Sequence, residues 1–362
     1  MSDYPADLTF HDFDRSLTRY QNYRTLRRLL KSREWDLAIQ VGPSVAAGLN
    51  LIRARLEWGQ SYIVSFGDPI GGWFRVIRGR FWSILGSLYE RALYLTCSGF
   101  AGCSPYLVGT AIKWGARRAT TIVDAVDTGV FRPVDSLQKR ELKIRFGLDP
   151  DHVVCGFVGG LPRARRDYTR GIELIGMLRH LKREDVSVLV VGDGNGLQAL
   201  KDATPPELRQ RVAFPGWIPH EDVVSAINAM DVGFLTQPLD ELGMYRLTTK
   251  LPEYLSCGVP VAMTPVPAYY DYLGSAGWSL PESHPEGVAF HRESAEWLDR
   301  LGHDELEARS QEARKLAERV FSYNVVTPRF RHFVDETLRL HGSNNVKLSP
   351  TETQTAHLET SA

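Results

Sequence analysis

The sequence predicts an α/β protein made of two doubly wound domains, and three features of the chain lead to this prediction. Short apolar segments alternate with helical patterns, the apolar segments show little polar alternation, and one segment rich in glycine, proline and charge interrupts the rhythm. Apolar runs without alternation are typical of parallel strands that are covered by helices on both faces. With 362 residues, the chain is long enough for two domains of ordinary size.

Six segments have the composition of buried strands, because they are short, apolar or β-branched, and bounded by Gly, Pro or Asp. They are Leu37–Val41, Tyr62–Phe66, Val153–Val158, Val186–Val191, Val232–Thr236 and Val259–Met263. The patterns between them predict helices: His220–Met230 carries one apolar stripe, and Ser104-Pro105 supplies an N-cap and a first-turn proline. This strand–helix alternation predicts parallel sheets.

The alternation is interrupted near Asp127–Asp135, where the boundary between the domains is expected. The prediction is an N-terminal domain over 1–133, a C-terminal domain over 134–320, a helix over 321–341 that packs back on the N-terminal domain, and a tail over 342–362. The tail is polar, so we expect it to be disordered. Residues 1–35 have the pattern of a basic helix without an opening strand or Gly-rich turn. We therefore expect the N-terminal domain to lack its first βα unit.

Amino-acid composition restricts the binding partners and the cellular compartment that can be expected for the protein. Lys plus Arg and Asp plus Glu each number 43, so net charge does not point to nucleic acid. The 17 basic and 12 acidic residues in 1–135 suit either an anionic partner or scatter over a solvated surface. The four cysteines form no CxxC pair and are expected to be buried free thiols. Without a signal peptide or a run of about 18 apolar residues, the cytoplasm is the expected location.

The segment Thr248–Val266 carries the strongest chemical signal. Thr248, Thr249 and Lys250 precede a short helix that is followed at once by a buried strand. A helix start at the carboxyl edge of a parallel sheet offers free N–H groups to a phosphate, and Lys250 adds a full positive charge. Glu253, one turn in, is placed to accept hydrogen bonds from ribose hydroxyls. The alternative is an amphipathic helix whose Lys and Glu face water.

Within this segment, Thr249–Thr264 resembles the signature of family 4 glycosyltransferases (group 1), which have two Rossmann-like domains facing a cleft, the GT-B architecture. Four other segments match in order and spacing: Thr121–Pro133, Val154–Leu174, Val190–Gly196 and Val212–Thr236. The resemblance implies that Glu253 holds the donor ribose and that Trp217 and Ile218 border its base. Thr248 and Thr249 belong to the helix start that is expected to bind the donor phosphate.

The resemblance also implies cationic groups at the donor diphosphate. Arg170 matches a lysine that neutralises the diphosphate, and Arg165 holds the spacing of its arginine partner. That arginine normally follows the glycine turn directly, where this chain has Gly160, so the choice among Arg163, Arg165 and Arg166 stays open. Arginine suits a diphosphate because its fork makes bidentate bonds. The alternative is a solvated arginine-rich loop.

Two positions depart from the pattern of the family. Eight residues before Glu253, where many members have a second glutamate, this chain has Tyr245. After the strand Tyr62–Phe66, where members often have a histidine before an aspartate, it has Gly67 and Asp68. Asp68 is expected to contact the acceptor or the donor sugar, with a plain loop aspartate as the alternative.

The implied activity is the retaining transfer of a sugar from a nucleotide-diphosphate sugar to an acceptor hydroxyl, without a cofactor or a metal. Catalysis would rest on stabilising the departing diphosphate, with Lys250, Arg170 and Arg165 as cations and Asp68 across the cleft. Asp149-Pro-Asp151 imitates a metal motif but precedes a strand, so we interpret it as a solvated turn. The alternatives are a catalytically dead relative that binds nucleotide or a partner, and a nucleotide-sugar epimerase.

The segment Gly71–Leu93 interleaves aromatic and aliphatic residues with Arg75, Arg78 and Arg80. A basic aromatic helix of this kind suits peripheral contact with an anionic membrane, at its inner face. The resemblance implies a glycan or a lipid-linked acceptor, which agrees with such a location. The alternative is a helix packed on the sheet of its own domain.

Overall fold

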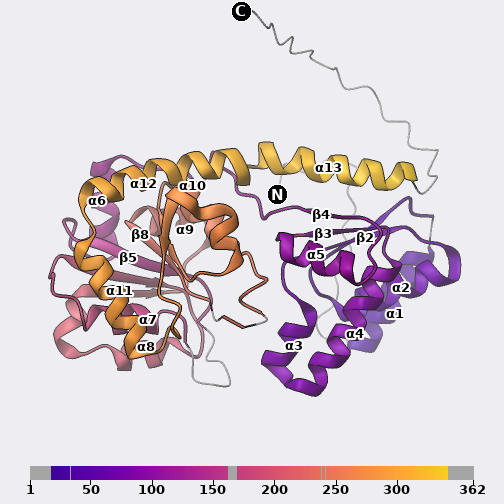
Figure 1. The fold of residues 1–362 in the computed structure, drawn as a ribbon, viewed down its shortest axis with the longest axis horizontal. Coiled ribbons are helices and arrows are strands. Elements are labelled where there is room, and N and C mark those ends of the chain that lie inside the picture. Colours follow the sequence, from indigo (N-terminus) through magenta and orange to yellow (C-terminus); the bar gives the residue numbers. More distant parts are fainter. Residues whose placement is uncertain (1–17, 33, 162–168, 238, 241, 341–362) are drawn as a thin grey trace, which may run out of the picture.

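The computed structural model describes residues 18–32, 34–161, 169–237, 239–240 and 242–340. These residues form two parallel β-sheets with helices packed around each, and the last two helices of the described chain follow one another along the molecule, one over each half (Figure 1). The alternating strands and helices expected from the sequence are therefore present. All four cysteines are buried free thiols, as predicted.

The N-terminal sheet has four parallel strands in the order β1-β2-β3-β4. Its strands are β1 (Ala38–Val41), β2 (Tyr62–Phe66), β3 (Gly99–Gly102) and β4 (Ala119–Thr121). Its helices are α1 (Arg19–Lys31), α2 (Val45–Trp58), α3 (Ile70–Arg78), α4 (Arg80–Thr96) and α5 (Pro105–Lys113). In the described part of the chain, the basic helix α1 precedes β1 and no strand opens the sheet before it. The strand order follows the sequence, so this sheet has no point at which the order reverses.

The C-terminal sheet has six parallel strands in the order β10-β9-β8-β5-β6-β7. Its strands are β5 (Val153–Val158), β6 (Val186–Val191), β7 (Val212–Gly216), β8 (Val232–Leu235), β9 (Val261–Met263) and β10 (Gly277–Ser279). Its helices are α6 (Ser136–Arg145), α7 (Ile172–Leu178), α8 (Leu197–Ala203), α9 (His220–Asn228), α10 (Lys250–Ser256), α11 (Val288–Arg300) and α12 (His303–Leu316). Short 3₁₀ and π segments lie at Pro206–Arg211, Tyr269–Leu273, Gly274–Ala276 and Ala317–Phe321.

This sheet reverses its strand order between β5 and β8, as in the doubly wound dinucleotide-binding fold. Every residue of β6 is buried and five of the six in β5 are buried, which explains their apolar sequences. The helix predicted from Ser104-Pro105 forms as α5, because the Ser104 hydroxyl accepts a hydrogen bond from the Leu107 N–H and Pro105 fills the first position.

The chain passes twice between the two halves, and the two passages are bonded to each other. The Val126 N–H donates to the Phe321 carbonyl at 2.8 Å, and the Tyr323 N–H donates to the Val126 carbonyl at 3.2 Å. After this crossing, α13 (Tyr323–Leu340) packs on the N-terminal sheet, where Phe333 shares a core cluster with Ile63 and Ala101 (Figure 1). The sequence predicts a helix over 321–341 that packs on the N-terminal domain in this way. The predicted tail, 342–362, lies outside the described residues.

The segment Gly71–Leu93 differs from its prediction, since it is not one helix. Gly79, with φ of 92°, ends α3 and starts α4, so the segment folds as a helical hairpin. Gly71 and Gly86 lie where the two helices touch: a Cβ on Gly86 would lie 2.6 Å from the Phe74 ring and 3.3 Å from the Gly71 Cα. Among the described residues, no helix combines the length and the apolar character needed to cross a membrane.

Candidate functional site

The candidate site lies at the carboxyl ends of β5 and β8, where the strand order reverses. The chains that leave two such neighbouring strands turn to opposite sides of the sheet, which opens a crevice between them. Two contacts hold the elements around this crevice together. The Val158 N–H at the end of β5 donates to the Tyr254 hydroxyl of α10 at 2.7 Å, and the Thr236 hydroxyl after β8 donates to the Glu173 carboxylate of α7.

Glycine lets the turns after β5 and β6 approach each other closely. Gly192 has φ of 140°, and a Cβ on it would lie 1.9 Å from the Gly159 carbonyl oxygen. Beside this contact, the Leu161 N–H donates to the Asp193 carbonyl at 3.0 Å. Gly160 is exposed between them at the sheet edge. The sequence signal Val190–Gly196 thus corresponds to backbone packing that shapes the predicted donor turn.

Lys250 and Glu253 form an ion pair at the start of α10. The Lys250 ammonium donates to both carboxylate oxygens of Glu253, at 3.1 and 2.8 Å. Their side chains are 23% and 14% exposed, so the pair is largely enclosed but reachable. Each charge is therefore satisfied by the other.

The predicted set of free N–H groups at this helix start is wrong. The Lys250 N–H donates to the Thr248 hydroxyl at 3.4 Å, and the Leu251 N–H donates to the Thr248 carbonyl at 3.1 Å. Pro252, the third residue of the helix, has no N–H group. Thr249 is the N-cap residue but makes no side-chain capping bond. The positive charge at the start of α10 is therefore carried by the side chain of Lys250 rather than by the backbone.

Arg170 stands directly before Gly171, the N-cap of α7, whose φ of 96° suits glycine. The Gly171 N–H donates to Glu173 at 2.8 Å, and Glu173 is fully buried. Burial raises the pKa of Glu173, while its bond from Thr236 and the positive charge of Arg170 act in the opposite direction. Arg163, Arg165 and Arg166 lie outside the described residues, so the choice among them stays a prediction.

Trp217 and Ile218 follow β7, at the same carboxyl edge of the sheet. Trp217 is 72% exposed, whereas Ile218 is partly buried against the core. An exposed indole next to an anchored aliphatic residue is a platform on which a flat base can stack. Their role at the base stays a prediction.

Asp68, at the end of β2, faces the C-terminal half of the protein. Its carboxylate lies 3.2 Å from the Nε of Arg246, in the segment that leads into α10. In the same segment the Tyr245 carbonyl accepts a hydrogen bond of 2.8 Å from the Ser104 hydroxyl, and its ring lies 6.1 Å from that of Tyr106. Tyr245, which stands where many family members have a second glutamate, therefore contacts the N-terminal half of the protein.

Asp124 is a functional candidate that the sequence reasoning missed. Burial raises the pKa of Asp124 to about 6, the negative charge of Asp68 adds to this, and Arg246 opposes it. Two carboxylates and one guanidinium thus meet where the domains face each other. No local signal could have found this group, because Asp68, Asp124 and Arg246 belong to three distant segments that only the fold brings together.

The structure thus brings most of the described predicted residues to one region. Lys250, Glu253, Thr248 and Thr249 come from the segment after β8, Arg170 from the segment after β5, and Asp68 reaches this region through Arg246. Their catalytic and binding roles stay predictions. The Asp149–Asp151 turn lies at the opposite, amino end of β5, exposed and with Asp151 paired to Arg140, which agrees with its interpretation as a solvated turn.

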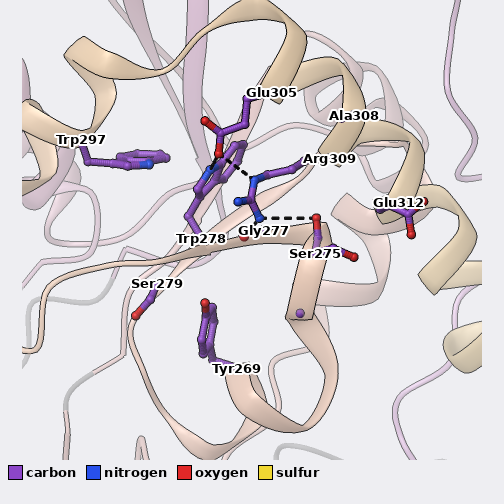
Figure 2. Close-up of a pocket in the computed structure, with 11 residues that line it drawn as sticks. Tyr269, Ser275, Gly277, Trp278, Ser279, Trp297, Glu305, Ala308, Arg309 and Glu312 are labelled. Atoms are coloured by element: carbon purple, nitrogen blue, oxygen red, sulfur yellow. Dashed lines mark hydrogen bonds and ion pairs between the residues drawn. The ribbon is translucent and has the colours of Figure 1, made fainter.

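A cavity of about 580 Å³ lies elsewhere, beside β10 and α12 (Figure 2). None of the predicted site residues lines it. Its central charged and indole groups are bonded to one another: the Trp278 indole donates to Glu305 at 2.7 Å, and Arg309 donates to the same carboxylate at 3.0 Å (Figure 2). Because these groups are already satisfied, the cavity is a poorer candidate for a polar substrate than the crevice.

Comparison with known sequences supports the resemblance. Residues 152–293 match the sequence model of the family described as "Glycosyl transferases group 1". The chain is 27% identical over 251 residues to the 2-deoxystreptamine N-acetyl-D-glucosaminyltransferase of Streptomyces fradiae, covering 56% of each chain. It is 30% identical over 168 residues to the 2-deoxystreptamine glucosyltransferase of Streptomyces kanamyceticus, covering 46% of this chain and 41% of the other. The matches span about half the length of these relatives.

Comparison with solved structures shows the fold over nearly the whole chain. Anabaena HepE in complex with UDP and glucose has a TM-score of 0.70 at 15% identity, covering 87% of this chain and 82% of that one. The sucrose-phosphate synthase of Thermosynechococcus elongatus has a TM-score of 0.69 at 15% identity, covering 89% and 79%. The two facing Rossmann-like domains of the GT-B architecture, predicted from the sequence, are therefore confirmed.

Proposed function

We propose that this chain, whose residues 152–293 form a group 1 glycosyltransferase domain within a GT-B fold, transfers a sugar from a nucleotide-diphosphate sugar to an acceptor hydroxyl. One observation carries this proposal. Lys250 and Glu253 on α10 and Arg170 before α7 flank the point where the strand order reverses, opposite Asp68 of the other domain. Nucleotides bind at such reversal points in doubly wound sheets.

The proposed reaction retains the anomeric configuration and uses no protein nucleophile, cofactor or metal. The acceptor oxygen bonds to the anomeric carbon while the bond from that carbon to the phosphate oxygen breaks. The proton of the acceptor hydroxyl passes to the departing phosphate. Lys250 and Arg170 stabilise the negative charge that develops on the diphosphate, and closure of the two domains excludes water.

In this proposal, Lys250 exchanges its partner Glu253 for the diphosphate when the donor binds. Lys250 and Glu253 neutralise each other in the structure. A donor whose ribose hydroxyls donate to Glu253 and whose diphosphate faces Lys250 would satisfy both groups at once. The pair therefore keeps two partly buried charges neutralised until the donor arrives.

The site can be tested by donor binding to single variants. We expect Glu253→Ala and Arg170→Ala each to weaken binding of the nucleotide sugar by about 1–3 kcal/mol, the range for a lost hydrogen bond to a charged group. Titration calorimetry with a panel of nucleotide sugars measures this. Arg209→Ala removes an exposed arginine of the same domain and serves as the control. Wild-type affinity in both site variants would refute the site.

Products distinguish transfer from its alternatives. Slow release of the nucleotide diphosphate, accelerated by an acceptor, supports the transferase. Donor binding without release across glycan, lipid-linked and 2-deoxystreptamine acceptors supports a catalytically dead relative. Conversion of one nucleotide sugar into another supports an epimerase.

We further propose that the α3–α4 hairpin contacts an anionic membrane, at the inner face. Within 71–93 the hairpin exposes eight large apolar side chains, Trp73, Val76, Ile77, Phe81, Trp82, Ile84, Leu85 and Leu88. Arg75, Arg78 and Arg80 are exposed beside them. Glu90, the acidic residue of the hairpin, is buried and accepts hydrogen bonds from the Gly71 N–H and the Tyr94 hydroxyl. The exposed face thus combines apolar and positive groups, which suits anionic lipid.

Membrane contact predicts a loss of vesicle binding when the arginines are neutralised. Arg78→Gln combined with Arg80→Gln should lower partitioning onto phosphatidylglycerol vesicles about 30-fold, because each arginine contributes about 1 kcal/mol near the surface. Co-sedimentation at two salt concentrations measures the effect. Leu137→Ser, at an apolar residue 67% exposed on α6, should change nothing. Equal sedimentation of the wild type and the double variant would exclude the contact.

A further inference from the structure

The Gln237 side chain is buried at the candidate site with no partner for either of its polar atoms. The residue is 4% exposed, and its Oε1 and Nε2 both lack hydrogen bonds. It follows β8 by two positions, at the carboxyl edge beside the reversal point. A buried amide without partners is costly, and in a native structure it calls for a group that satisfies it.

The backbone around Gln237 is held firmly on both sides. Its own N–H donates to the Thr264 hydroxyl after β9 at 3.0 Å. The preceding residue, Thr236, is bonded to Glu173 of α7. Within β8, whose side chains alternate between the two faces of the sheet, Phe234 packs on the side of α7, and the side chain of Gln237 is buried just beyond the end of this strand. Leu235, the residue two positions earlier, packs in the same core cluster as Leu251 and Tyr254 of α10.

The chemistry of an amide restricts the ligand that fits. Its oxygen needs a donor, and its NH₂ group needs an acceptor. A diphosphate offers only acceptors, so it would leave Oε1 unsatisfied. In the proposed function the ribose hydroxyls go to Glu253, and the base goes to Trp217 and Ile218 beyond β5 and β6. Of the groups of the donor, the sugar remains, and its hydroxyl or acylamino groups both donate and accept.

We infer that Gln237 recognises the transferred sugar of the donor, which makes it a specificity-determining residue of this site. The inference rests on the proposed function. It differs from the predicted roles of Lys250, Glu253 and Arg170, which all concern the nucleotide diphosphate. If Gln237 contacts only the sugar, its removal lowers the affinity for the complete donor but leaves the affinity for the nucleotide diphosphate unchanged.

The test compares the two ligands in Gln237→Leu, a change that keeps the size of the side chain but removes its polar atoms. The probes are UDP with UDP-glucose and UDP-N-acetylglucosamine, and the corresponding GDP, ADP and dTDP pairs. For the pair that the wild type binds, we expect Gln237→Leu to lose about 10–100-fold in affinity for the nucleotide sugar. Affinity for the nucleotide diphosphate should stay within about twofold. Without ligand, the variant should melt at the wild-type temperature or above, because an unsatisfied amide has been removed.

Gln60→Leu is the matched control. Gln60 is similarly buried, but its amide donates to the carbonyls of Trp35, before β1, and of Ser61, before β2, at the amino edge of the N-terminal sheet. This control should lower the melting temperature and leave the ratio of the two affinities unchanged. An unchanged ratio in Gln237→Leu, with Glu253→Ala still weakening donor binding, overturns this inference alone. A wild type that binds no pair overturns the proposed function and this inference with it.

Discussion

Lys250→Ala is expected to lower the turnover of sugar transfer by about 10²–10³-fold, the cost of removing one fixed group that stabilises developing charge. At the start of α10 the positive charge comes from the side chain of Lys250, since the N–H groups of Lys250 and Leu251 are bonded to Thr248. Backbone N–H groups therefore cannot replace the missing charge. The side chain of Glu253 loses its partner but stays 14% exposed, so water can solvate it and the fold should survive.

Steady-state kinetics with saturating acceptor measures the Lys250 effect. The loss should appear mainly in kcat, because the charge on the diphosphate grows as the bond to the sugar breaks. Lys201→Ala, at an exposed lysine of α8, should retain full activity. An unchanged kcat in Lys250→Ala would mean that another group carries the leaving-group charge.

Gly192→Ala is expected to destabilise the protein by more than about 3 kcal/mol, because steric overlap and backbone strain act together. The new Cβ would lie 1.9 Å from the Gly159 carbonyl oxygen, and φ at Gly192 is 140°. The neighbour is backbone, so it cannot rotate away as a side chain would. The turns after β5 and β6 must separate, which also deforms the predicted donor turn at Gly160. The variant should therefore lose donor affinity even at temperatures where it stays folded.

Urea unfolding followed by tryptophan fluorescence measures this destabilisation. Gly147→Ala provides the control, since Gly147 also has a positive φ, 75°, but a Cβ there meets nothing within 4 Å. That variant should lose only about 1 kcal/mol, the cost of the left-handed conformation itself. Similar unfolding midpoints for Gly192→Ala and Gly147→Ala would contradict the close packing of the two turns.

Elements with strong local signals were predicted well. The strands β2, β5 and β6 form over the predicted residues, because fully buried parallel strands need uninterrupted apolar sequence. The helix α5 starts where Ser104 and Pro105 predict it. The break at Gly79 was missed, because a single glycine within an amphipathic pattern is compatible with a continuous helix. The hairpin forms through contact between Gly71 and Gly86, which belong to two different turns of the pattern.

The sequence predicts only the part of the candidate site that stands in local motifs, and the roles of those residues stay predictions. Lys250, Glu253 and Arg170 stand in segments whose local pattern predicts a role for them, and the fold brings those segments to one edge of the sheet. Asp124, Arg246 and Gln237 were missed. The first two acquire their significance from Asp68, and Gln237 from an absence of partners that only coordinates reveal. The sequence predicts free N–H groups at the start of α10, but the N–H groups of Lys250 and Leu251 donate to Thr248 instead.

The sequence by itself determined the parallel sheets, the glycine turns and the cationic segment after β8, since each depends on side chains that are neighbours in the chain. Only the tertiary structure decided which distant groups meet: Asp68 with Arg246, Val126 with Phe321 and Tyr323, and α13 with the N-terminal sheet. The physical reason is the range of the interactions. Backbone conformation and strand burial respond to residues a few positions away, whereas a charge or an unsatisfied amide responds to whatever the fold places within a few ångströms.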